Sequence, residues 1–292
     1  MPFSAEMPNI QDCNSQRQWI DSHCHFDFKH FDLNRDQQWQ QLKSFGCAGL
    51  VIPGVLASSW LTLIDLCQSK PWGFALGLHP YFMANHKAQD IELLEQVCRQ
   101  QLSAEVKGNN KLVALGEFGL DFMLNADDHD NQIELCRQQF QLAQTLELPV
   151  ILHCRKAYDE TAAMIRRLKF TQGGVVHAFS GSYQQGMALI RLGFKLGVGG
   201  ALSHPRANKL RSTISRLPLS SLVLETDSPD MKPAFWQGPD NSPLTLLLLA
   251  QIVASLHHLT INEVIFTCNN NLLAALPHLT TVLQIDNNDV KA

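Results

Sequence analysis

No CxxC pair occurs among the eight cysteines of this 292-residue chain, so neither a thiol-rich zinc module nor a CxxC redox motif is predicted. Reduced thiols in a cytoplasmic protein are expected instead. A strong charge of one sign is also missing: 23 Lys and Arg against 27 Asp and Glu leave a net charge of −4 with histidine neutral. That balance is atypical of a protein that coats nucleic acid, but it permits an enzyme that grips a phosphate chain locally.

Long apolar segments are scarce as well. The first 18 residues have neither the basic start nor the apolar core of a signal peptide. The longest apolar stretch, Leu244–Leu256, is short and interrupted for a membrane span and is typical of a buried helix. We therefore expect a cytoplasmic monomer without a membrane partner.

What the chain does contain is enough apolar material for a large core, because 45% of its residues are hydrophobic and 17% are charged. Eight short apolar runs, rich in Val, Ile and Leu, are each too short for a helix. They lack the alternation of a half-exposed sheet, which favours parallel strands buried on both faces. The predicted strands are Trp19–Ser22, Gly49–Val55, Phe74–Leu78, Leu112–Gly116, Val150–His153, Gly174–Ala178, Phe194–Val198 and Leu222–Glu225.

Helical patterns lie between most of these runs. The predicted helices are Asp36–Phe45, Ser58–Gln68, Gln89–Val106, Asn131–Leu146, Lys156–Leu168, Tyr183–Leu192 and Pro205–Leu217. One or two final helices in Thr260–Leu276 should cover the barrel, and the polar end Gln284–Ala292 should fray. Strand and helix repeated eight times predict a single (β/α)8 TIM barrel over residues 1–292, with a core of about 18–278.

The segment DSHCHF, Asp21–Phe26, carries a HxH pair at the end of the first strand. Side chains at i and i+2 of an extended strand share a face, so His23 and His25 should point to one place. Neutral imidazole is the commonest protein ligand of transition metals. One such pair is a moderate signal by itself.

Metal-type side chains also end other predicted strands. Glu117 closes the fourth strand, His153 the fifth and His177 the sixth, and Asp227 follows the eighth. Barrel enzymes carry their active sites at the carboxyl ends of the strands. Together with the HxH pair these side chains form a strong signal for a metal centre.

Four imidazoles and two carboxylates exceed the needs of one zinc ion with an open position and suit two divalent ions. Glu117 is the candidate bridge, because it is the mid-chain carboxylate between the two histidine groups. His23, His25 and Asp227 would complete one ion, and His153 with His177 would hold the other. Asp227 would orient the attacking water and take its proton.

Each assignment has a structural alternative. A histidine at a strand end can be a hydrogen-bonded core residue, and Glu117 or Asp227 can be a helix N-cap, since both precede turn residues.

Four further residues are candidate substrate contacts: His79, Asp121, Arg155 and Arg206. Arg155 lies two residues beyond His153, so its guanidinium could meet a phosphate, or form a salt bridge to Asp121 or Glu117. Arg206 opens the densest basic run, which includes Lys209, Arg211 and Arg216 and reads equally as a solvated helix face or as a guide for a nucleic-acid backbone.

Taken together these motifs resemble the TatD deoxyribonuclease family of metal-dependent hydrolases, within the amidohydrolase-like barrels. The resemblance covers nearly the whole chain, and the run Gly197–Arg211 is most similar to its YjjV-type bacterial branch. The landmarks are DSHCHF, GLHP (Gly77–Pro80), ALGEFGLDF (Ala114–Phe122), LPVILHCR (Leu148–Arg155), HAFSG (His177–Gly181) and LETDSPDM (Leu224–Met231).

The resemblance implies a TIM barrel with two divalent cations on the six positions named above. It also implies hydrolysis of phosphodiester bonds in DNA, trimming single strands from the 3′ end. The family is mostly described as magnesium-dependent, whereas imidazole-rich sites suit zinc or manganese. Three positions depart from the family pattern: Phe122 stands where Tyr is frequent, Ala178 where Cys or Ser is frequent, and Lys156 where an acid is frequent. These departures bear on substrate preference, since no ligand position is lost.

The leading hypothesis is therefore a two-metal phosphodiesterase that acts on DNA ends. The alternative is hydrolysis of a carboxyl ester, lactone or amide on the same machinery, including an aminoacyl ester on tRNA. A binding protein that keeps the fold without catalysis is a third hypothesis.

Overall fold

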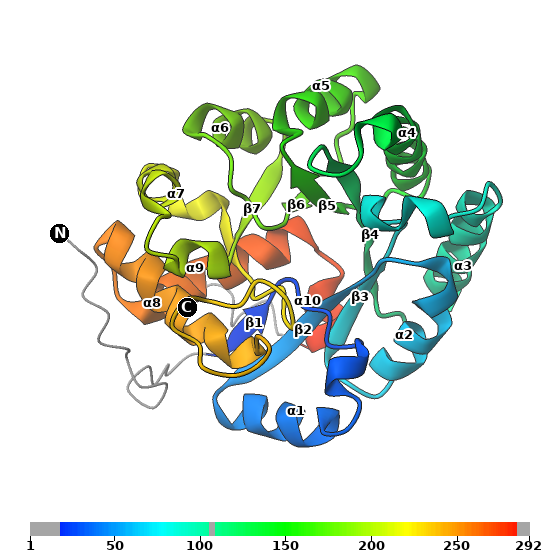
Figure 1. The fold of residues 1–292 in the computed structure, drawn as a ribbon. Helices are drawn as coiled ribbons and strands as arrows, with labels where there is room; N and C mark the ends of the chain where they lie inside the picture. The colour runs from blue at the N-terminus through cyan, green and yellow to red at the C-terminus, as the bar shows by residue number, and fades with distance from the viewer. Residues whose placement is uncertain (1–17, 105–108, 285–292) are drawn as a thin grey trace.

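In the computed structural model, residues 18–104 and 109–284 are described. Eight parallel strands pair in chain order from β1 to β8, which confirms the predicted barrel (Figure 1). All eight predicted strands are present, with ends shifted by a few residues. They are β1 Trp19–Asp21, β2 Cys47–Gly54, β3 Trp72–Leu76, β4 Leu112–Asp121, β5 Val150–Arg155, β6 Gly174–Val176, β7 Phe194–Val198 and β8 Leu222–Leu224.

Helices surround the strands (Figure 1). They are α1 Arg35–Ser44, α2 Trp60–Cys67, α3 Asp90–Ala104, α4 His129–Thr145, α5 Tyr158–Leu168, α6 Tyr183–Arg191, α7 Asn208–Ile214, α8 Leu246–His257, α9 Ile261–Ala275 and α10 Leu279–Leu283. The α7 helix is shorter than predicted, because residues 205–207 form a turn before it. Parts of the predicted segments Gln89–Val106 and Gln284–Ala292 lie outside the described residues, as do residues 1–17.

Hydrogen bonds beyond the last residues of β1 and β8 bring the two ends of the sheet together. Ser22 N donates to Leu224 O at 3.0 Å, and Asp227 N donates to His23 O at 2.9 Å. These bonds place the loop after β1 beside the loop after β8, so residues about 200 positions apart share one rim of the barrel.

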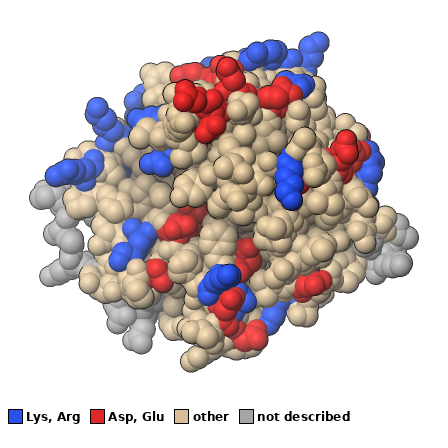
Figure 2. Space-filling view, turned by 45° about the vertical axis from the view of Figure 1, so that its right-hand side comes forward, with Lys and Arg blue, Asp and Glu red and all other residues tan. Residues whose placement is uncertain are grey.

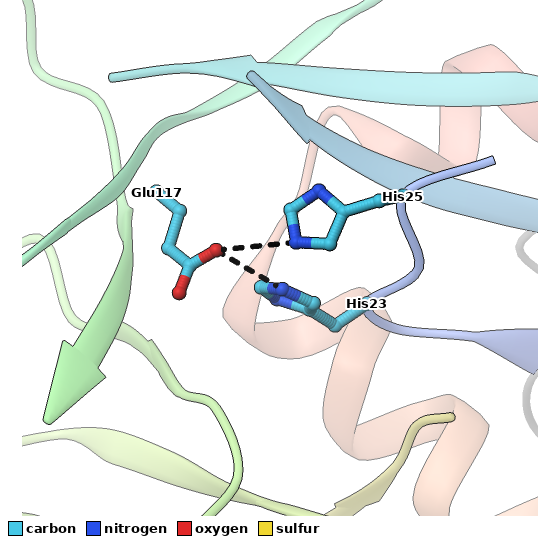
Figure 3. A group of neighbouring side chains, drawn as sticks. All are labelled: His23, His25 and Glu117. Atoms are coloured by element: carbon cyan, nitrogen blue, oxygen red, sulfur yellow. Dashed lines mark ion pairs between the residues drawn. The ribbon is translucent and has the colours of Figure 1, made fainter. Parts of the chain in front are cut away.

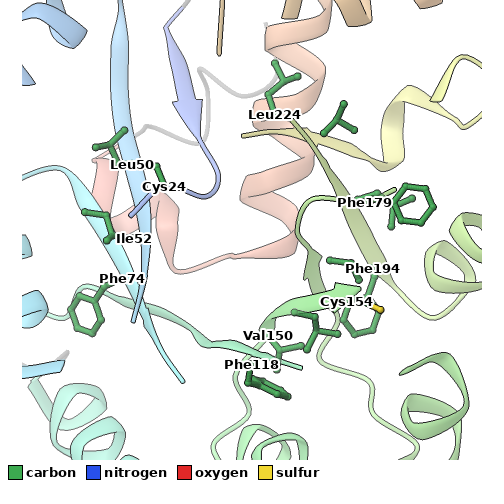
Figure 4. Close-up of a cluster of buried hydrophobic side chains, with 14 of the residues drawn as sticks. Cys24, Leu50, Ile52, Phe74, Phe118, Val150, Cys154, Phe179, Phe194 and Leu224 are labelled. Atoms are coloured by element: carbon green, nitrogen blue, oxygen red, sulfur yellow. The ribbon is translucent and has the colours of Figure 1, made fainter. Parts of the chain in front are cut away.

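The strands bury alternate side chains in two different places. Leu50 and Ile52 of β2 and Val150 of β5 face the helices in one core cluster (Figure 4). Leu152 of β5 belongs to the same cluster. Val51 and Ile151, which lie between them, face the barrel interior in a second cluster, which also contains Ile20, Ala75, Val113, Ala114, Val175 and Val223. This alternation is the period of two expected for a strand.

The amino-terminal end of the barrel is closed by α9 and α10. Leu272, Leu276 and Leu279 are almost fully buried and pack against the interior residues of the strands. A capping box at Thr260 and Glu263 starts α9. Covering of the barrel by the final helices is thus confirmed, and the plug leaves the carboxyl ends of the strands for a site.

The predicted buried helix over Leu244–Leu256 is α8, whose side chains are mostly buried. Within the described residues no single helix is long and apolar enough to cross a membrane, and the one pair that passes together, Pro243–His257 with Ile261–Ala275, is bent by 103°. Seven cysteines in the described part of the chain are free and buried. Cys24 and Cys154 lie in the core cluster that faces the helices, since each alternates along the chain with a candidate ligand (Figure 4).

Candidate metal centre

Two residues further along each strand, toward its carboxyl end, the side chains that point into the barrel change from apolar to polar. Ile151 is followed at that spacing by His153, Val175 by His177, and Val223 by Glu225. Because the barrel interior below is filled, these side chains form the floor of the open end.

Glu117 joins this layer through an irregularity in β4. The pairing with β5 shifts between Leu115 and Phe118, so three residues of β4 span two of β5. An extra residue changes the face on which the following side chains lie. Phe118 therefore packs among the buried hydrophobic residues that face the helices, and Glu117 points inward. The strand also continues to Asp121, four residues beyond Glu117, whereas the sequence predicted its end at Gly116.

The two oxygens of the Glu117 carboxylate face two separate groups of donors. Oε2 lies 3.2 Å from His23 Nε2 and 3.6 Å from His25 Nε2 (Figure 3). Both imidazoles also approach Asp227, whose Oδ1 is 3.5 Å from His23 Nε2 and 3.6 Å from His25 Nε2. We call His23, His25, Asp227 and Glu117 Oε2 the first donor group.

The second donor group surrounds Glu117 Oε1. His177 Nε2 lies at 3.0 Å, and His79 Nε2 and His153 Nδ1 each lie at 3.1 Å. His79, which the sequence suggested as a substrate contact, is thus among the potential ligands. Asp121 stands behind this group, with Oδ2 3.1 Å from His153 Nε2.

The separations fit metal coordination. Ligand atoms placed tetrahedrally at ~2.0–2.1 Å from a zinc ion are ~3.3–3.4 Å apart, within the range of the distances above. His23 Nε2, the nitrogen that faces Glu117 and Asp227, is buried without a hydrogen-bond partner. Three clusters in the described residues can hold an ion: His23 with His25 and Glu117, His23 with His177 and Asp227, and His79 with Glu117 and His153.

Burial sets the protonation of the HxH pair. It lowers the pKa of His23 to about 4, with a further contribution from His177, and lowers the pKa of His25 to about 3. Both rings are therefore neutral near pH 7 and offer lone pairs to a cation. Burial of Glu117 opposes its charge, but the surrounding imidazoles outweigh burial and hold its pKa well below the usual range.

Asp227 and Glu117 do not cap helices. Glu117 lies within a strand, and Asp227 sits in a loop that reaches its next helical residue at Pro243. The backbone of Asp227 has a φ of +56°, a left-handed conformation that is uncommon for residues other than glycine. Its backbone bond to His23 holds it in this conformation, and burial raises the pKa of its carboxyl well above the ordinary value.

Two buried carboxylates beside the centre were missed in the sequence. Glu225 accepts a hydrogen bond from Ala178 N at 2.5 Å, and its Oε1 lies 3.6 Å from His177 Nδ1. A Cβ on Gly197 would lie 2.1 Å from the Glu225 carboxylate, so glycine makes room for it. Counting in twos along β8 from Val223 would have identified Glu225.

Asp21 is the second missed carboxylate. Thr226 Oγ1 donates to Asp21 Oδ2 at 2.5 Å, and the backbone N–H groups of Thr226 and His23 donate to Asp21 Oδ1. Burial raises the pKa of Asp21 to about 8. The residue belongs to the DSHCHF segment, but its partner lies 205 positions away, so only the folded chain shows the link.

The basic run near α7 is only partly available to a ligand. Arg211 is buried and donates to the carbonyl oxygens of Leu202, His204 and Pro205, so it braces the loop before α7. The Arg216 guanidinium lies over the Tyr183 ring at 4.3 Å. Arg206 is exposed in the turn before α7 and takes part in none of the contacts described for the two donor groups. Arg211 is therefore unavailable to a ligand, and a contact of the exposed Arg206 with a nucleic-acid backbone stays a prediction.

A parallel barrel with imidazoles and carboxylates gathered at the carboxyl ends of its strands is the arrangement of a metal-dependent hydrolase. The family model described as TatD related DNase matches residues 20–277, and the chain belongs to that family.

Two relatives and one solved structure illustrate the match. The uncharacterized metal-dependent hydrolase YjjV of Escherichia coli is 36% identical over 254 residues, which cover 87% of this chain and 95% of the relative. Its crystal structure superposes with a TM-score of 0.82, covering 89% of this chain and 98% of that chain. The 3′-5′ ssDNA/RNA exonuclease TatD of Erwinia billingiae is 32% identical over 238 residues, which cover 77% of this chain and 86% of the relative.

Proposed function

We propose that this protein is a two-metal phosphodiesterase that trims single-stranded nucleic acid, with DNA ends as the preferred substrate, from the 3′ end. The observation that carries the proposal is the position of Glu117, whose two oxygens face separate donor groups. A carboxylate that bridges two divalent ions requires this arrangement. The name of the Erwinia relative supports the choice of substrate.

The residues divide between two ions. His23, His25 and Asp227 would hold the first ion, and His153 and His177 would hold the second, with His79 beside them. Two bound divalent ions would supply a nucleophilic water at neutral pH and electrostatic stabilisation of the phosphoryl oxygens. A cation beside Asp227 would favour its carboxylate over the protonated form, and the carboxylate would orient the water and accept its proton. Glu225 would keep the Nδ1 proton of His177 in place, so that Nε2 faces Glu117.

The distribution of charged side chains on the surface is consistent with a protein that binds the end of a nucleic-acid strand at the metal centre. On the face in Figure 2, Lys and Arg side chains of the described residues lie singly or in small groups among Asp and Glu, and tan areas separate them. This face therefore offers few clustered phosphate contacts, and we expect binding to depend on the reacting end of the strand.

The experiment is an end-trimming assay on a 5′-labelled single-stranded oligonucleotide, with the protein loaded in turn with magnesium, manganese or zinc. We expect a ladder that shortens from the 3′ end. Asp227→Asn and Glu117→Gln should each lower the rate by about 10²-fold or more, because each removes a ligand and Asp227 also serves as the base. Asp230→Asn, an exposed acid three residues from Asp227, is the matched control and should trim at nearly the wild-type rate.

Equal trimming by the Asp227→Asn preparation would trace the activity to a contaminant and refute the proposal. A parallel series on matched phosphodiester and carboxyl-ester substrates decides the bond class. Faster hydrolysis of the carboxyl ester, lost in the same two variants, would replace phosphodiester cleavage with ester hydrolysis at this centre.

A further inference from the structure

An open hollow of about 390 Å³ lies beside the metal centre, between the end of β5 and the loop that precedes α6. Its wall includes Arg155, Lys156, Ser180 and Ser182, and no acidic side chain is among its lining residues. Two cations and two hydroxyl groups thus surround one space.

Arg155, which lines the hollow, is linked to the second donor group through Asp121. Arg155 Nη1 lies 3.9 Å from Asp121 Oδ2, and the same oxygen lies 3.1 Å from His153 Nε2. Arg155 follows His153 by two residues in β5, a step of ~6.6 Å along a strand. Its side chain is 60% exposed, so most of the guanidinium remains open to a ligand.

The hydroxyl groups have protons to donate into the hollow. Tyr158 is buried, which raises the pKa of its phenol and keeps it protonated. Its oxygen accepts from Ser180 N at 2.8 Å and lies 3.1 Å from Ser180 Oγ, so the phenol can donate to that hydroxyl. The Ser180 proton is then available. Ser182 Oγ accepts from Gln185 N at the start of α6, which leaves its own proton available as well.

We infer that this hollow binds a phosphate group of the substrate strand, namely the phosphate one nucleotide on the 5′ side of the bond that is cleaved. The inference rests on the proposed function. At the last linkage of a strand that ends in a 3′ hydroxyl, the neighbouring phosphate can lie only on the 5′ side. Guanidinium, ammonium and hydroxyl donors are the groups that bind phosphate oxygens without reading the base.

Lys156 and Lys169 provide a matched pair of positions for the test. Lys156 lies one residue before the N-cap of α5, and Lys169 is the C-cap of the same helix. Both are exposed, and both are left-handed, with φ of 57° and 51°. Lys→Glu at either position changes the net charge by the same amount, but only Lys156 lines the hollow. Lys→Asn at each position removes the charge with a residue that tolerates the left-handed conformation.

The probe is a fluorescent tetrathymidylate with a hydrolysis-resistant last linkage, prepared with either a charged phosphate or a neutral methylphosphonate at the next linkage. Binding to the metal-loaded protein is followed by fluorescence anisotropy. The wild type and both Lys169 variants should bind the charged probe about tenfold or more tightly than the neutral probe. Lys156→Asn and Lys156→Glu should lose most of this preference.

Absence of a preference in the wild type, absence of binding, or an unchanged preference in the Lys156 variants would each overturn the inference. The trimming assay on the same proteins tests the proposed function separately. A charge preference that depends on Lys156 in a protein that trims no strand would refute the phosphodiesterase and retain the anion subsite. If the wild type trimmed strands but showed no preference for the charged probe, the phosphodiesterase would be retained and the anion subsite refuted.

Discussion

Among individual side chains, Glu117 shows how a weak motif gains meaning from its neighbours. In the sequence it is one glutamate in a glycine-rich segment, and the case for it rests on its place between two histidine groups. In the structure its two oxygens are shared between those groups, at 3.0–3.2 Å from the nearest imidazole on each side. His79 joins the second group because GLHP ends β3 beside β4, a placement that its motif alone does not specify.

Glu225→Gln tests a carboxylate that acts through a ligand. The negative charge beside His177 Nδ1 favours a proton on that nitrogen and leaves Nε2 free for a cation. The neutral amide removes this bias with little change in shape. We expect metal affinity to fall by about 10–100-fold, measured by competition with a chelating indicator.

Exposed Glu147→Gln is the control and should keep the wild-type affinity. If Glu225→Gln retained the wild-type affinity as well, Glu225 would merely fill the space opposite Gly197.

Among the elements, β4 differs most from its prediction. The apolar character of the sequence stops near Gly116, and the following GEFGLD segment resembles a turn. The hydrogen-bond ladder nevertheless continues to the pair Asp121 and Arg155. Polar and glycine residues are expected at the open mouth of a barrel even where the strand persists, so the hydrophobic pattern underestimated β4, and to a smaller extent β5, at this end.

The helices α9 and α10, which close the amino-terminal end of the barrel, should contribute to the stability of the fold and not to metal binding or catalysis. Leu276 is fully buried against the barrel interior, at the end opposite the metal centre. We expect Leu276→Ala to lower the free energy of unfolding by about 2–5 kcal/mol in urea titrations, because it opens a cavity in a closed core. Metal affinity of the folded protein should stay close to the wild-type value.

Leu61→Ala is the comparison for that experiment. Leu61 lies on α2 with 68% of its surface exposed, so its truncation should change stability by about 0.5 kcal/mol or less. A small effect of Leu276→Ala, equal to that of Leu61→Ala, would contradict the role assigned to the plug.

For the molecule as a whole, the centre gathers ionisable groups that burial penalises. His23, His25 and Glu117 are buried together, and a bound cation would compensate them for the loss of contact with water. A ligand that binds only the folded state stabilises it by about 2.7 kcal/mol at 100 times its dissociation constant. We therefore expect chelation of the metal to lower the melting temperature by roughly 5–10 °C, as scanning calorimetry would show.

Readdition of the divalent ion should restore the melting temperature. The Glu117→Gln variant is the control, since its melting temperature should respond much less to the chelator. An equal response in the wild type and in the variant would locate the stabilising ion elsewhere.

The architecture could be predicted because it follows from local patterns. Apolar runs separated by amphipathic segments identify buried parallel strands and their covering helices, and parallel strands place their carboxyl ends at one rim. The positions of His23, His25, His153, His177 and Asp227 at that rim follow from the same reasoning.

Other features depend on contacts between distant segments. The bulge that turns Glu117 inward, the bond from Thr226 to Asp21 and the approach of His79 arise from packing and hydrogen bonding across strands. Arg211 was a candidate for ligand binding in the sequence, but in the structure its guanidinium donates to carbonyl oxygens of the loop before α7. The periodicity of the sequence indicates which face of a strand or helix is apolar. The partner of a buried polar group depends on which distant segments the closed barrel brings together.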